Sequence, residues 1–274
     1  MVGFASMSAL RTALVLVIAS NLVMIGIRVL LDPQLLGMPG GLQSALEPAA
    51  LLILAAYVVR WATGGDRRVA QAIVRAGTAV GLVGGMVEVV HITLENYGRL
   101  GARAESVTTG GFLVGLLLLW GIAGYRATRE TAAVGAGLLA GSWSALVGML
   151  MATTYGFSQL FWDLPRLEQR NVGSPDFLRS GWTDLHSFTI ADVFEAGFKV
   201  LLLGPIAGAV LGGLGALLAR AILAIRRPWA GLSRRCPSCP CATGRPARAG
   251  REPFPEITGS VPSRDSPRDD RASP

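Results

Sequence analysis

The chain has 274 residues, of which 51% are hydrophobic and 16% charged, and its formal net charge is +7. A mean hydropathy of +0.47 excludes an ordinary soluble domain, which needs more polar surface than this composition supplies. The basic residues are scattered over short loops and the C-terminal segment, with no soluble domain to present them. We therefore interpret the charge as a signal for membrane orientation, with the lipid bilayer as partner, and expect no binding to nucleic acid.

Apolar stretches long enough to cross ~30 Å of hydrocarbon recur along the chain. They predict six transmembrane helices at about 12–31, 44–59, 69–92, 108–125, 131–153 and 200–223. Arg11 and the apolar residues after it resemble the start of a signal peptide, but the apolar run continues to Leu31 without a clear cleavage site. The first stretch is therefore interpreted as a retained helix, and the predicted fold is all-α, a polytopic membrane helix bundle.

Arginine clusters follow the second, fourth and sixth predicted spans, whereas the other connections carry acidic or balanced charge. The clusters consist of Arg60, Arg67, Arg68, Arg126, Arg129, Arg220, Arg226, Arg227, Arg234 and Arg235. By the positive-inside rule, this alternation predicts that both termini lie in the cytoplasm. Because the chain is rich in arginine, alanine and glycine, a bias typical of GC-rich bacterial genomes, we expect a multi-pass protein of the bacterial inner membrane.

The long connection before the sixth span, 158–199, carries Phe161, Trp162, Phe177 and Trp182. Amphipathic aromatic side chains prefer the interface between membrane and water. This connection is therefore predicted to contain an interfacial helix or lid on the outer surface.

The composition divides the chain into a transmembrane domain, 1–226, and a tail, 227–274. The tail is rich in proline, arginine, serine and aspartate, and it cannot bury enough apolar surface to offset the entropy of ordering it. It is predicted to be disordered and cytoplasmic.

All three cysteines, Cys236, Cys239 and Cys241, lie in this predicted tail. Since zinc needs four ligands and neither histidine is near, the thiols are predicted to stay free, with a metal site across a dimer or redox sensing as the alternative.

Glycines recur every four residues in two predicted spans: Gly77, Gly81 and Gly85 in the third, and Gly204, Gly208 and Gly212 in the sixth. Small residues at this spacing let the backbones of membrane helices approach closely. The pattern predicts that both helices are buried in the bundle. Contact with a second copy or another membrane subunit through these faces is the alternative.

Three ionisable residues of the third span, Glu88, His91 and Glu95, share one helix face with its glycines. From Arg75, the predicted cytoplasmic edge, a rise of ~1.5 Å per residue places Glu88 ~20 Å into the bilayer. A carboxylate at that depth is costly unless it is paired or hydrated. These residues are therefore candidates for a binding site or a proton relay.

Other ionisable residues are predicted to lie at the same outer level. Asp192, Glu195 and Lys199 precede the sixth span, while Glu47 and Arg28 lie in the second and first spans. Together with the third-span residues they form one predicted polar site in the outer leaflet. The alternative places all of them at the lipid headgroups, with Glu195 and Lys199 as an ordinary i,i+4 pair, and for the sixth-span residues this alternative is preferred.

The preferred function is a small transporter or permease-like protein that binds a proton, an ion or a small solute in this layer. The alternatives are a non-catalytic scaffold or partner subunit and, less favoured, a membrane-embedded enzyme. No cofactor is predicted, because a Glu-x-x-His metal site would need a second such step and haem would have only His91 and His186 as ligands. The sequence also contains no glycine-rich phosphate loop.

Overall fold

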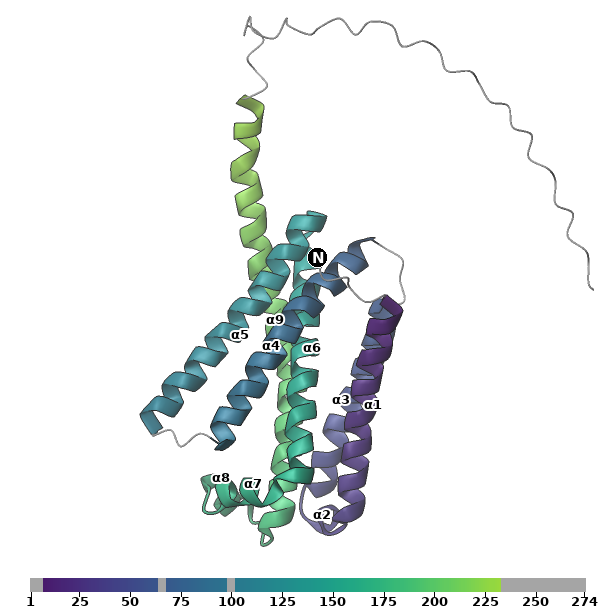
Figure 1. Cartoon of the computed structure of the whole chain (residues 1–274), viewed down its shortest axis with the longest axis vertical. Helices are drawn as coiled ribbons and strands as arrows, with labels where there is room; N and C mark the ends of the chain where they lie inside the picture. Colours follow the sequence, from purple (N-terminus) through teal and green to yellow (C-terminus); the bar gives the residue numbers. More distant parts are fainter. Residues whose placement is uncertain (1–6, 64–67, 98–101, 233–274) are drawn as a thin grey trace, which may run out of the picture. The chain divides into compact units, whose positions relative to one another are not determined.

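The computed structural model describes residues 7–63, 68–97 and 102–232, and this part of the chain is helical, with no strand (Figure 1). Within these residues the helices are α1 (Met7–Leu31), α2 (Gln34–Gly37), α3 (Gly41–Thr63), α4 (Arg68–Tyr97), α5 (Ala102–Thr131), α6 (Val134–Trp162), α7 (Leu164–Asn171), α8 (Pro175–Ser180) and α9 (Leu185–Leu232). Of the described helices, α1, α3, α4, α5, α6 and α9 are long and apolar enough to cross a bilayer. The prediction of an all-α protein with six such helices is confirmed, and its orientation in the membrane stays a prediction.

The last long helix begins earlier than the apolar pattern indicates. The sixth predicted span starts near 200, because charged side chains before that point lower the local hydropathy, whereas α9 begins at Leu185. Charged side chains do not interrupt a helix backbone, and Asp184 caps the first turn. Its carboxylate accepts the backbone N–H of Ser187 at 2.8 Å and that of His186 at 3.3 Å. A side-chain hydrogen bond with Ser187 lowers the pKa of Asp184, although partial burial opposes this effect.

At its other end α9 continues through Leu232, beyond the predicted start of the tail at 227. The rest of the predicted tail lies outside the described residues. So do Cys236, Cys239 and Cys241.

Helix α6 is the most buried of the six long helices, and glycines bring its neighbours close to it. Gly81 and Gly85 of α4 face Ser144 and Gly148 of α6, so that a Cβ on Gly81 would lie 2.9 Å from the Val147 side chain. On another side of α6, the predicted stripe of α9 packs in the same way, with Gly208 and Gly212 against Gly137 and Gly141. In lipid this close backbone approach provides the van der Waals contact that holds helices together. Both glycine stripes therefore pack within the chain.

The short helices α2, α7 and α8 lie at the same end of the bundle, which we call the α7–α8 end (Figure 1). Helices α7 and α8 occupy the connection between α6 and α9 for which the aromatic residues predict an interfacial segment. Leu164 and Leu167 of α7 are buried. This anchoring places the polar side of α7 over the ends of α4 and α9.

Candidate functional site

A cavity of about 480 Å³ lies at the α7–α8 end, between α4, α6, α7, α8 and α9. Polar side chains make up much of its lining, which is costly for helices that cross a membrane. The polar lining residues are Glu88, Glu95, Asn96, Thr153, Gln159, Arg170, Asn171, Ser174, Asp176 and Asp192. Of its four carboxylates, Glu95 is paired with Arg170 and Asp176 with Arg179, so Glu88 and Asp192 leave an excess of acidic groups that favours a positively charged occupant. We call this space the polar cavity.

Glu88 lines the polar cavity from α4, on the turn that follows the glycines packed against α6. Its side chain is 15% exposed, and its Oε1 lies 3.5 Å from Nδ1 of His91. Its Oε2 is buried and has no hydrogen-bond partner among the described residues. A buried carboxylate oxygen without a donor costs free energy, so this oxygen is suited to bind a proton or a cation.

Two neutral side chains of α6 also bring unpartnered polar atoms to this cavity. Thr153 and Gln159 are 3% and 2% exposed, and both line the cavity. Thr153 Oγ1 and Gln159 Nε2 are buried and lack a hydrogen-bond partner within the part of the chain that the structure describes. Gln159 is held in place through its other atom, because its Oε1 accepts the amide N–H of Asn96 at 3.0 Å. A buried polar atom of this kind costs ~1–3 kcal/mol when it is left unsatisfied.

Helix α7 closes one side of the polar cavity through contacts with two long helices. Arg170 donates to Glu95 and Asn96 of α4. Asn171 donates to Thr189 at 3.3 Å and to Asp192 at 3.4 Å, both on α9. These polar contacts add to the apolar packing of Leu164 and Leu167 in holding the wall in place.

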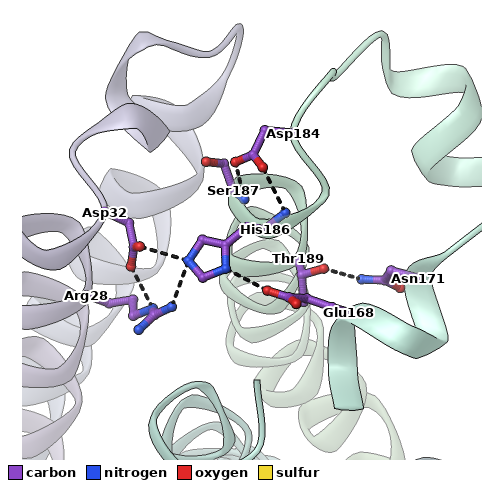
Figure 2. Close-up of polar contacts among 8 residues, drawn as sticks. All are labelled: Arg28, Asp32, Glu168, Asn171, Asp184, His186, Ser187 and Thr189. Atoms are coloured by element: carbon purple, nitrogen blue, oxygen red, sulfur yellow. Dashed lines mark hydrogen bonds and ion pairs between the residues drawn. The ribbon is translucent and has the colours of Figure 1, made fainter. Parts of the chain in front are cut away.

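A network around His186 anchors the other side of α7 (Figure 2). His186 Nδ1 lies 2.6 Å from Oε1 of Glu168 on α7, and Nε2 lies 2.8 Å from Oδ1 of Asp32, just after α1. Arg28 completes the network, with Nε 2.9 Å from Asp32 Oδ2 and Nη2 3.2 Å from His186 Nε2. Because both ring nitrogens face carboxylate oxygens, an imidazolium would donate from both, and its charge and that of the guanidinium would balance the two carboxylates. Nε2 then has no lone pair for Arg28, which acts in this state through its ion pair with Asp32.

The structure separates the residues of the predicted polar site into several groups. Glu88, Glu95 and Asp192 line the polar cavity together. His91 contacts Glu88 but is not among the lining residues; its ring stacks on Phe112 with centroids 5.0 Å apart.

The remaining predicted site residues lie outside the polar cavity. Glu195 and Lys199 form an exposed pair, 2.7 Å apart, beside a second cavity of about 500 Å³. Glu47 is half-buried and accepts from Gln43 at 2.6 Å. Arg28 belongs to the His186 network.

Several residues of the site were not identified from the sequence. Asp32, Glu168 and His186 lie in connections between the predicted spans, although the i,i+4 spacing of Arg28 and Asp32 is a detectable pairing signal. Thr153 and Gln159 have no sequence signal, since neutral polar residues are common near the ends of membrane helices. They become candidate site residues only because the structure buries them in the cavity that Glu88 lines.

Within residues 7–63, 68–97 and 102–232, no group of three or more His, Cys, Asp or Glu side chains is arranged to hold a metal ion. The polar side chains that line the polar cavity carry carboxylates, amides, hydroxyls and one guanidinium. Comparisons with protein-family models, curated proteins and solved structures found no match to this chain.

Proposed function

We propose that this protein is a small transporter or permease-like membrane protein whose polar cavity binds a proton or a small cationic solute. The observation that carries the proposal is the combination, in one cavity, of excess carboxylates with three buried polar atoms that lack partners, on Glu88, Thr153 and Gln159. A cation or protonated amine would satisfy the two acceptor atoms, Glu88 Oε2 and Thr153 Oγ1, whereas the Gln159 amide N–H is a donor and would bind an acceptor atom of the solute. The carboxylate oxygen would accept from the cation or carry its proton, and the hydroxyl oxygen would help to complete its solvation.

The position of the cavity supports access from one side of the membrane. It lies at the α7–α8 end, which the positive-inside rule predicts to be the outer side. The polar contacts of Arg170 and Asn171 at the edge of this wall are ones that water can replace, which supports exchange of a solute with this side of the membrane.

The test compares Glu88→Gln with Glu47→Gln. Both changes remove one carboxylate from a long helix, but Glu47 lies outside the cavity and already accepts a hydrogen bond from Gln43. Purified protein is reconstituted in liposomes that contain a pH-sensitive dye, and a potassium diffusion potential drives uptake of protons alone, sodium, ammonium or ethanolammonium. Stabilisation of the purified protein by the same cations is measured as a shift in thermal midpoint.

We expect the native protein to show uptake or stabilisation with one of these probes. Glu88→Gln should lower the rate or apparent affinity by about tenfold or more, because a charged hydrogen-bond partner is lost. Glu47→Gln should behave like the native protein. Equal effects of the two substitutions, or no response of the native protein to any probe, would contradict the proposal.

A non-catalytic scaffold or partner subunit is the second candidate, and the His186 network favours it. That network joins α1, α7 and α9 through charged contacts, an arrangement that holds helices in register. Under this proposal Glu88→Gln lowers thermal stability with no separate loss of uptake. The same two measurements therefore distinguish the candidates.

A further inference from the structure

A third hollow, of about 850 Å³, lies between α3, α4 and α6, away from the polar cavity. Its floor consists of buried side chains, among them Val74, Trp143 and Leu146, which are 1%, 5% and 8% exposed. Its walls include Trp61 and Val69, which are 73% and 47% exposed, so the hollow is open on the outer surface of the bundle. We call this space the lateral groove.

The floor of the lateral groove presents hydrocarbon rather than hydrogen-bonding groups. The indole N–H of Trp143 donates to Thr78 Oγ1 at 2.9 Å, so this polar group is already satisfied inside the protein. Ser142 is a small polar exception. A groove of this composition, lying between helices that meet the criteria for membrane spans, suits a hydrocarbon chain.

Arg68 is the one charged side chain among the described residues that line the lateral groove. It is the first residue of α4 and is exposed, while Trp61 lies near the end of α3. Arginine and tryptophan at helix ends are typical of the level of the lipid headgroups. A guanidinium binds phosphate through two parallel hydrogen bonds. The groove thus combines an apolar channel with a phosphate-binding group at its edge.

The surrounding charge indicates which headgroup fits. Gly77 near the start of α4 packs on Ala140 near the start of α6, so the α5–α6 turn lies at the same end of the bundle as Arg68. Exposed arginines therefore gather at this end, with Arg60 on α3 and Arg126 and Arg129 on α5. Clusters of basic residues at a membrane surface attract anionic lipids over zwitterionic ones.

We propose that the lateral groove is a binding site for an anionic phospholipid, with an acyl chain over Val74 and Leu146 and the phosphate on Arg68. This site is independent of the polar cavity and of any transport through it. It would hold α3 against α4 and α6 by filling the space between them.

The test uses Arg68→Gln with Arg60→Gln as the matched control. Both remove one exposed arginine at the same end of the bundle, but Arg60 does not line the groove. Delipidated protein in detergent is titrated with phosphatidylglycerol and, separately, with phosphatidylcholine. Bound lipid is counted by native mass spectrometry, and stabilisation is followed by the thermal midpoint.

We expect phosphatidylglycerol to bind and stabilise the native protein more strongly than phosphatidylcholine. Arg68→Gln should weaken phosphatidylglycerol binding about tenfold or more, whereas Arg60→Gln should retain it. Ala70→Trp, which fills the groove without changing its charge, should reduce binding of both lipids.

Three outcomes would overturn the proposal. Equal losses of phosphatidylglycerol binding in Arg68→Gln and Arg60→Gln would show that the lipid responds to the general positive charge of this end rather than to Arg68. Equal binding of the two lipids by the native protein would show that the headgroup is not recognised. Unchanged binding in Ala70→Trp would place the lipid elsewhere. If Arg68→Gln does not fold, the headgroup comparison and Ala70→Trp still decide the question.

Discussion

Loss of Arg28 should destabilise the protein by ~2–3 kcal/mol, because it leaves Asp32 with one partner in place of two. The Arg28 and Asp32 side chains are 10% and 16% exposed, and Nε lies 2.9 Å from Oδ2. Arg28 Nε and Asp32 Oδ2 make no hydrogen bond, so the contact is an ion pair, and removing one partner of a buried ion pair costs up to ~3–5 kcal/mol because it leaves an unpaired charge. In Arg28→Gln, Asp32 keeps only its contact with His186, at 2.8 Å.

The assay is equilibrium unfolding in mixed micelles of detergent and sodium dodecyl sulfate, followed by helical circular dichroism. A double-mutant cycle with Arg28→Gln and Asp32→Asn should give a coupling of ~1–3 kcal/mol. Arg179→Gln is the control, since its pair with Asp176 is 76% and 82% exposed and should contribute nothing measurable. Additive effects in the cycle, or equal losses for Arg28→Gln and Arg179→Gln, would refute the reasoning.

Two further predictions concern helix packing and capping. Gly141→Ala should lower the free energy of unfolding by ~1–3 kcal/mol in the same assay, because the added Cβ would collide with the backbone of Gly208 and Gly212. Gly135→Ala is the control: the space around Gly135 is open, so this change should be neutral or slightly stabilising. Asp184→Ala should lower stability by ~1 kcal/mol at neutral pH through loss of the α9 cap. Because the folded pKa of Asp184 is lowered, that contribution is complete above the usual value of 3.8 and is lost as the pH falls through the lower folded pKa. The difference in thermal midpoint between native protein and Asp184→Ala should therefore shrink on acidification, and a constant difference would contradict the assignment.

Part of the candidate site could be predicted from helix periodicity. Glu88 and Glu95 share a face with the glycines of α4, and this spacing alone indicates that they turn toward protein. Asp192 lines the same cavity, and the sequence places it at this level because it lies just before the apolar part of α9. The periodicity also placed His91 on this face, but a helix face is broad, and packing against α5 leaves the ring on Phe112 instead.

Contacts between distant segments could not be predicted in this way. Asp32 lies more than a hundred residues before both Glu168 and His186, and no local pattern relates them. Their meeting depends on how α1, α7 and α9 pack. The burial of Thr153 and Gln159 likewise depends on neighbours from other helices, because the same residues on a free helix would be hydrated.

The amino-acid sequence by itself determines six apolar helices and the small-residue faces through which α4 and α9 approach α6. These features follow from the thickness of hydrocarbon and the repeat of a helix, which are local constraints. Only the tertiary structure decided which polar groups share a cavity, which are left without partners, and where a groove opens between α3 and α4. Burial and hydrogen bonding depend on atoms contributed by distant parts of the chain, so they exist only once the helices have packed.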